Sequence, residues 1–213
     1  MDSDADRRRS PRHPEDTVPT PHPAPHPTPL TLAVIVASTR AGRFGPTVAD
    51  WFLDHVRTRP ELAPVVVDVA AADLPHTFGA PAPALADIGA TLAAADAFVV
   101  VTPEYNHSYP GGLKNLIDLH SAQWRAKPVG FVSYGGRSGG LRAVEHLRAV
   151  FAELHTVTVR DTVSFHDPWT ARDDTGALQA GEGAELAAKT LLDQLVWWAE
   201  ALRAARATRP YVA

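Results

Sequence analysis

The chain shows two patterns of apolar positions from residue 30 onward. In five short runs almost every residue is apolar and many are β-branched, which is typical of parallel strands covered on both faces. These runs are 31–37, 65–69, 97–101, 128–134 and 156–160. Between and after them, apolar residues recur at helical spacing, as in amphipathic helices. The first predicted helix begins at Pro46, and the other four cover about 84–94, 110–121, 139–154 and 183–207.

Strands and helices therefore alternate, which predicts an α/β fold with a parallel sheet. Five strands joined by right-handed crossovers favour the flavodoxin-like, doubly wound order 2-1-3-4-5. The direction of winding reverses between the first and third strands of this order. Ligands of such sheets bind outside the carboxyl ends of the strands at that point. The loops after the first, third and fourth strands are therefore the candidate site.

The two ends of the chain depart from this pattern. Residues 1–29 have almost no aliphatic side chains, and every second residue from Pro19 to Pro29 is proline. Because proline lacks an amide donor, this segment predicts an extended tail rather than a helix or an interior strand. His22 and His26 lack a third metal ligand, so a solvated linker is favoured over a metal site. The expected organisation is a tail over 1–29, one domain over 30–207 with an irregular stretch at about 161–180, and a short tail over 208–213.

Composition excludes several classes of function. A net charge of -4 and a pI near 6.2 give no reason to expect a nucleic-acid partner. Without cysteine, the chain has no thiolate nucleophile and no cysteine-bound metal. No apolar stretch approaches the roughly 18 residues that cross a bilayer, and the first residues lack the apolar core of a signal peptide. We expect a cytoplasmic protein without membrane contact.

The loop over residues 38–47 suits a phosphate group. Ser38, Arg40 and Arg43 offer hydroxyl and forked cationic donors, and the helix that starts at Pro46 adds amides and its dipole. The patterns of a nucleoside triphosphate P-loop and of a dinucleotide-binding turn are both missing. Because many such loops contain serine, glycine and arginine, this loop alone leaves phosphate binding open.

The other two loops suit a flat heterocycle. In residues 102–109, Asn106 and the backbone amides can bind its polar edge while Tyr105 forms an aromatic wall. We interpret Glu104 as a residue that positions this loop and His107 as a bystander. Residues 133–140 contain four glycines, which we interpret as backbone that must lie close to a ligand. A flexible turn capped by Ser138 is the alternative.

Together these loops resemble those of the NAD(P)H-dependent FMN reductase family, over about residues 30–160. The likeness is carried by Ser38-Thr39-Arg40-x-x-Arg43, by Pro103-Glu104-Tyr105-Asn106 with the following Pro110-Gly111-x-Leu113-Lys114-Asn115, and by Ser133-Tyr134-Gly135-Gly136. Ala37 is a departure, since the family usually has glycine there. The resemblance implies a flavodoxin-like protein that binds FMN, with NADPH or NADH as the electron donor.

The resemblance also implies a role for each matching residue. Ser38, Arg40, Arg43, Phe44 and Gly45 would contact the FMN phosphate. The isoalloxazine ring would contact Pro103, Glu104, Tyr105, Asn106, Ser133, Tyr134, Gly135 and Gly136. Hydride would pass from the nicotinamide through FMN to a small-molecule acceptor such as a flavin or a quinone, without a catalytic acid, base or nucleophile from the protein.

The resemblance further implies a homodimer or homotetramer. His120, Trp124 and the helix over 110–121 are candidates for the interface, with burial in the core as the alternative. Two other functions stay open. The first is an FMN-binding electron carrier or interaction protein without reductase turnover. A carrier would be expected to present its acidic residues on one face, whereas those of this chain are scattered. A hydrolase is disfavoured because Ser38 has no obvious adjacent base.

Overall fold

The computed structural model describes residues 28–77, 79 and 83–212. Its strands are all parallel and lie in the order β2-β1-β3-β4-β5, which confirms the predicted flavodoxin-like topology. The elements in chain order are β1 (Leu30–Val36), α1 (Gly45–Arg57), β2 (Leu62–Asp68), α2 (Pro83–Ala94), β3 (Ala97–Pro103), α3 (Gly111–Asp118), β4 (Pro128–Gly135), α4 (Leu141–Glu153), β5 (Val157–His166), the short 3-10 helix η1 (Pro168–Thr170) and α5 (Glu182–Thr208).

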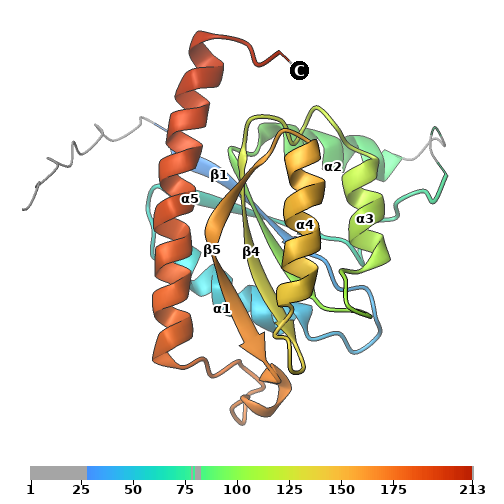
Figure 1. Cartoon of the computed structure of the whole chain (residues 1–213), viewed down its shortest axis with the longest axis vertical. Coiled ribbons are helices and arrows are strands. Elements are labelled where there is room, and N and C mark those ends of the chain that lie inside the picture. Colours follow the sequence, from blue (N-terminus) through green and yellow to red (C-terminus); the bar gives the residue numbers. More distant parts are fainter. Residues whose placement is uncertain (1–27, 78, 80–82, 213) are drawn as a thin grey trace, which may run out of the picture.

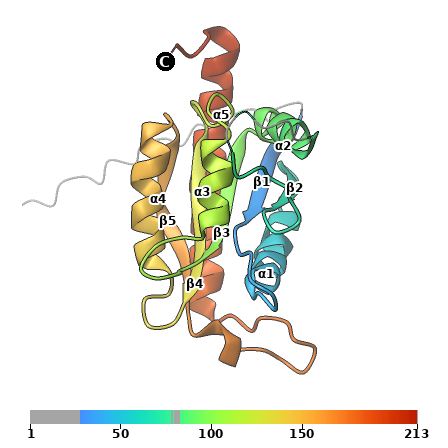
Figure 2. The same ribbon diagram turned by 90° about the vertical axis from the view of Figure 1, so that its right-hand side faces the viewer.

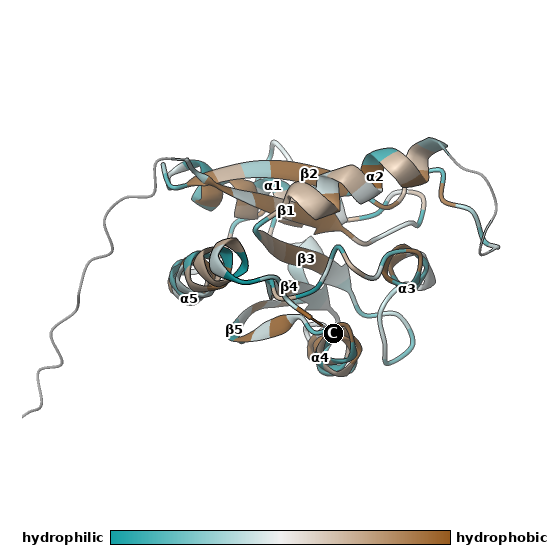
Figure 3. Ribbon diagram, turned by 90° about the horizontal axis from the view of Figure 1, so that it is seen from above, coloured by the Kyte–Doolittle hydropathy of each residue, from teal (hydrophilic) through white to brown (hydrophobic). Residues whose placement is uncertain are grey.

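Helices cover both faces of the sheet (Figures 1 and 2). One apolar cluster joins α1 and α5 to the first face, and a second joins α2, α3 and α4 to the other. Seen from above, the apolar residues concentrate in the sheet and on the helix surfaces that face it (Figure 3). Gly130 allows α5 to approach β4, because an added Cβ there would lie only 2.8 Å from Leu191 Cδ1.

The two edge strands differ from the prediction at their ends. β2 begins at Leu62, three residues before the predicted run, and β5 continues to His166 rather than ending at residue 160. Both strands lie at an edge of the sheet and expose some of their residues. Pro64 interrupts the pattern of β2, which an edge strand tolerates, and the polar residues 160–162 interrupt that of β5. The expected irregular stretch therefore begins only after His166.

The two ends of the described chain contact the body of the fold. Arg203 of α5 donates hydrogen bonds to the carbonyls of Thr28 and Pro29, at 3.2 and 3.4 Å. The rest of the predicted N-terminal tail lies outside the described residues. After α5, the segment 209–212 folds back until the Tyr211 hydroxyl lies 2.9 Å from His155 Nδ1. None of the described helices is long and apolar enough to cross a membrane.

Trp124 and His120 belong to the core, which decides between the two alternatives left by the sequence. Trp124 is fully buried against Phe98 and Phe151, with ring centroids 4.8 and 5.5 Å away. Its indole Nε1 donates to the carbonyls of Ile117 and His120. Because these two side chains are covered within one chain, they are not available for an interface between subunits.

We expect Trp124→Ala to lower the free energy of unfolding by about 3–5 kcal/mol, since it leaves a large cavity in the core. Trp197→Ala is the matched control because Trp197 is 63% exposed, and its effect should stay within about 0.5 kcal/mol. Urea unfolding followed by circular dichroism gives both values. Equal stabilities of the two variants would contradict the assignment of Trp124 to the core.

Candidate functional site

Three loops gather at the carboxyl edge of the sheet, the lower end of the molecule in Figure 1. Residues 37–44 join β1 to α1, residues 104–110 join β3 to α3, and residues 136–140 join β4 to α4. β1 and β3 are neighbours in the sheet although β2 separates them in the chain. The loops therefore surround the point at which the winding of the sheet reverses, as the sequence predicted.

The first loop places the start of α1 directly on two buried hydroxyl groups. Gly45 is buried, and a Cβ added there would overlap Ser38 Oγ and lie 3.0 Å from Tyr134 Oη. Neither hydroxyl has a hydrogen-bond partner within the described part of the chain. Burial also raises the pKa of the Tyr134 hydroxyl above its ordinary value, so the group stays protonated. Tyr134 thus lies beneath the first loop, with its hydroxyl beside Gly45.

The start of α1 has the properties of an anion site. Phe44 is the N-cap residue, no side chain caps the helix, and its first turn contains no acidic residue. The amides of this turn therefore meet no protein carboxylate, and the helix dipole favours a negative charge in front of them. Ser38 Oγ, buried and unpartnered, is a further donor. These residues fit a phosphate group.

Arg43 makes an ion pair that the sequence did not reveal. Its guanidinium donates to both carboxylate oxygens of Asp68, Nη1 to Oδ1 at 2.6 Å and Nη2 to Oδ2 at 2.5 Å. Nη1 also donates to the Ser38 carbonyl at 3.1 Å. These bonds hold the pKa of the Asp68 carboxyl below its ordinary value and raise the pKa of Arg43. Asp68 is the last residue of β2, so the strand next to β1 holds Arg43 of the first loop.

Arg40 connects the first loop to the second. Its guanidinium carbon lies 3.9 Å from the centroid of the Tyr105 ring, a cation–π contact. Tyr105 and Ser108 exchange two backbone hydrogen bonds across a tight turn. Asn106 and His107 occupy the middle of this turn with positive φ angles of 49° and 73° and are exposed. Asparagine tolerates this conformation better than most residues, so Asn106 serves the turn and also faces solvent.

Glu104 fastens the second loop to the third. Its side chain is 5% exposed and accepts from Ser138 Oγ at 2.7 Å and from Arg142 Nε at 2.6 Å. Burial alone would raise the pKa of Glu104, but the donors from Ser138 and Arg142 bring it below the ordinary value. The carboxylate is thus turned toward α4. This arrangement agrees with the interpretation of Glu104 as a residue that positions the loop.

Two glycines of the third loop have a packing role, which the sequence did not reveal. Gly140 has a φ of 86°, and a Cβ there would lie 2.7 Å from Ser133 Cβ. Gly139 has a φ of 58°, and a Cβ there would overlap Ser164 Oγ. Ser133 is itself buried, with its hydroxyl donating to the Gly139 carbonyl at 2.8 Å. Gly136 has room for a side chain, since a Cβ added there would come no closer than 3.6 Å to its nearest neighbour, Asp167 Oδ1.

The segment after β5 also reaches the site. Asp167 donates its amide to the Gly135 carbonyl at 2.8 Å, which ties the segment to the end of β4. Arg172 then lies over the Phe44 ring, with its guanidinium carbon 4.3 Å from the ring centroid. This exposed arginine therefore covers Phe44, the N-cap residue of α1. No motif in the sequence pointed to it.

Comparisons with known proteins agree with this geometry. Residues 30–170, well over half of the chain, match the family model described as NADPH-dependent FMN reductase. The chain belongs to this family. The family description names FMN and NADPH, so the cofactors predicted from the resemblance are confirmed at the level of the family.

Individual relatives support the same assignment. An NAD(P)H-dependent FMN reductase of Schizosaccharomyces pombe is 36% identical over 122 residues, which are 51% of this chain and 60% of that protein. The match thus spans about three fifths of the relative's length. The FMN-dependent NADPH-azoreductase of Staphylococcus aureus is 27% identical over 176 residues, 76% of this chain and 92% of that protein.

Solved structures show the same fold. The flavoenzyme NAD(P)H:acceptor oxidoreductase FerB from Paracoccus denitrificans has a TM-score of 0.63 and 25% identity, over 80% of this chain and 97% of that one. A Streptococcus pneumoniae flavodoxin has a TM-score of 0.51 and 16% identity, over 79% of this chain and 98% of that one. The second likeness concerns the fold alone.

We expect the Glu104 link to stabilise the protein by about 1–3 kcal/mol, as a buried, charged hydrogen-bond acceptor. Glu104→Gln should remove most of this, whereas Glu145→Gln should have little effect because Glu145 is 74% exposed. The pKa of Glu104 is lowered from 4.5 in the folded protein. The difference between native protein and Glu104→Gln should therefore be constant from pH 8 to pH 5 and shrink as the pH falls below about 4. A difference that instead grows in acid would contradict the link.

Proposed function

We propose that the protein is an NAD(P)H-dependent, FMN-containing oxidoreductase that transfers electrons from a nicotinamide through FMN to a small molecule such as a flavin or a quinone. The observation that carries this proposal is the uncapped start of α1, which meets the buried Ser38 hydroxyl at the reversal point of the sheet. Membership of the FMN reductase family supports it independently.

The proposed contacts divide between the loops. The phosphate would be held by the first turn of α1 with Ser38, Arg40, Arg43, Phe44 and Gly45, and the ring by Pro103, Glu104, Tyr105, Asn106, Ser133, Tyr134, Gly135 and Gly136. Because Ser133 and Tyr134 are buried strand residues, their share would come from the backbone or from the phosphate side. Bound FMN would supply the redox chemistry, accepting hydride from the nicotinamide and giving electrons to the acceptor.

The chain's own residues would orient the cofactor and exclude water. The Arg40 contact with Tyr105 and the Glu104 link to α4 hold the second loop in place from both sides. No described side chain needs to act as an acid, base or nucleophile. An azo compound is a further candidate acceptor, by analogy with the S. aureus relative. Cytoplasmic location and a homodimer or homotetramer stay predictions.

Cofactor binding and turnover test this proposal together. The purified protein should bind one FMN per chain, with riboflavin binding roughly ten- to a hundredfold more weakly because it lacks the phosphate. Flavin fluorescence quenching gives both dissociation constants. The FMN-loaded protein should then oxidise NADPH or NADH continuously when benzoquinone is supplied.

The outcomes separate the alternatives. Equal affinity for FMN and riboflavin would exclude a phosphate site at the start of α1. Tight FMN binding without nicotinamide oxidation would favour the alternative of an electron carrier or interaction protein.

Asp68 should weaken FMN binding, because its carboxylate occupies Arg43 and repels the phosphate dianion. Asp68→Asn keeps the size of the side chain and should lower the FMN dissociation constant about five- to tenfold. Riboflavin affinity should not change, since riboflavin carries no charge at this position. Quenching titrations of both flavins measure the effect.

Two controls complete this experiment. Asp54→Asn removes a carboxylate that is 75% exposed and pairs with Arg57 within α1, so FMN affinity should stay the same. In an Arg43→Ala background, Asp68→Asn should lose the part of its effect that depends on releasing Arg43. Weaker FMN binding by Asp68→Asn alone would show that Asp68 positions Arg43 instead of competing for it.

A further inference from the structure

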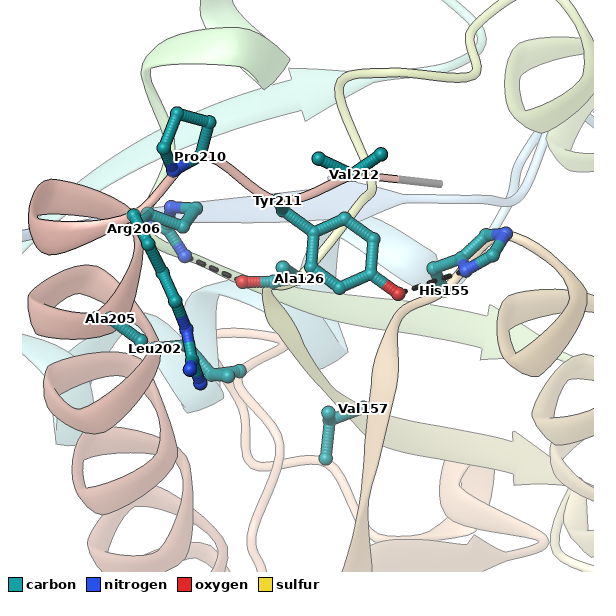
Figure 4. A pocket seen from close by; sticks show the side chains of 10 residues that line it. Ala126, His155, Val157, Leu202, Ala205, Arg206, Pro210, Tyr211 and Val212 are labelled. Carbon is teal, nitrogen blue, oxygen red and sulfur yellow. Dashed lines mark hydrogen bonds between the residues drawn. The ribbon is translucent and has the colours of Figure 1, made fainter.

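A cavity lies at the opposite end of the sheet from the three loops of the proposed flavin site. It has a volume of about 440 Å³ and is formed by the last turns of α5, the segment 209–212 and the residues that precede β4 and β5 (Figure 4). Its apolar lining consists of Ala126, Val157, Leu202, Ala205, Pro210 and Val212. A volume of this size is typical of small-molecule sites.

The polar lining of this cavity is basic. Arg206 and Arg209 line it together with His155 and Tyr211, and among the lining residues that the structure describes there is no acidic side chain. In Figure 4 the Tyr211 side chain lies over the cavity with its hydroxyl hydrogen-bonded to His155. This bond closes one side of the cavity while Arg206 lies along another.

Positive charge exceeds negative charge around this cavity. An adjoining hollow shares Arg206 and Tyr211 and adds Arg125 and Lys127. Asp96 is the one carboxylate that pairs with the cations here within the described ranges, and it serves both Arg203 at 3.4 Å and Arg206 at 3.2 Å. Arg206 also donates through Nη1 to the Ala126 carbonyl at 2.6 Å, and these two bonds use only part of the five N–H donors of its guanidinium.

Two of these cations are partly or fully withdrawn from water. Burial and the nearby Arg206 lower the pKa of Lys127 to about 8, although its ammonium donates to the carbonyls of Leu92 and Ala93. Burial also lowers the pKa of Arg206, and Asp96 only partly offsets this. A cation in a partly dry environment gains from an anion brought next to it.

We propose that this cavity binds a small apolar carboxylate, with the hydrocarbon part against Leu202 and Val157 and the carboxylate at Arg206 and Arg209. The apolar walls require a ligand with a hydrocarbon portion, and the arginines select a negative head group. A guanidinium can meet a carboxylate with two parallel hydrogen bonds. The site is independent of the proposed flavin chemistry, because none of its lining residues belongs to the three loops.

Octanoate is a suitable probe, titrated by calorimetry into the full chain saturated with FMN. Saturation keeps octanoate away from the phosphate loop at the other end of the molecule. Octanoate should bind measurably at one site per chain, and octanol, which has the same chain without the charge, should bind at least about tenfold more weakly. Octyltrimethylammonium should not bind.

Variants locate the binding. Leu202→Trp fills the cavity and should abolish octanoate binding, whereas Leu186→Trp adds the same ring at a 65% exposed position of the same helix and should leave it unchanged. Arg209→Gln changes an exposed residue without disturbing the core and should weaken octanoate binding about tenfold. Arg160→Gln is its control, since Arg160 is 89% exposed and lies outside the cavity.

The proposal is overturned if octanoate fails to bind or if octanol binds equally well. It is also overturned if octanoate affinity is unchanged in a folded Leu202→Trp protein. Arg209→Gln decides the question if Leu202→Trp does not fold, because unchanged affinity in that variant removes the role of the arginine. FMN affinity measured in every variant checks that the distant site is intact.

Discussion

The flavin end of this protein depends on one close contact, between the first turn of α1 and the ends of β1 and β4. Gly45 lies so near Ser38 and Tyr134 that any side chain there would overlap their hydroxyl groups. Val48 and Phe52 anchor the body of α1 in the core. Together with the contact at Gly45, they fix the direction in which the amides at the start of α1 point. Apart from each other, these two buried hydroxyls have no hydrogen-bond partner in the described chain, and a buried hydroxyl left unpaired costs about 1–3 kcal/mol. A ligand that supplied those partners would offset this cost, so the place that is least satisfied within the fold is also the best prepared for binding.

The arginines of the first loop are engaged before any ligand arrives. Arg43 is paired with Asp68, and Arg40 lies over Tyr105. Asp68 therefore balances the charge of Arg43 in the absence of a phosphate, and phosphate binding at Arg43 would exchange one anion for another. Because such an exchange would add less energy than the capture of an unpaired arginine, FMN affinity at the proposed site would depend on the backbone amides and Ser38 as much as on the cations.

The sequence was most informative where residues are buried on both sides. β1, β3 and β4 are central strands with continuous apolar runs, so their position, their order and the loops that follow them could be predicted. The edge strands β2 and β5 expose part of their length, and their limits could not be predicted from polarity. The ion pair of Asp68 with Arg43 could not be predicted either. It depends on the register of β2 against β1, which places the end of β2 beside the first loop. The packing role of Gly139 and Gly140 could not be predicted, because a glycine required by a packed neighbour and one required by a ligand look alike in a sequence.

Basic residues occupy both ends of the sheet, and distance keeps their effects separate. β4 has eight residues and leads from the cavity beside α5 to the flavin loops, a span of about 26 Å at the usual rise of a strand. Charges this far apart are screened at physiological ionic strength, where the Debye length is about 8 Å. An anion at one end therefore cannot attract or repel an anion at the other to a useful extent. A displacement could pass between the two ends through β4 and β5, or through α5, which packs on β1, β3, β4 and β5 and carries both the apolar wall of the cavity and residues that meet α1. Because the strands are held by their neighbours in the sheet whereas α5 packs through side chains alone, a shift of α5 is the easier way to couple the two ends.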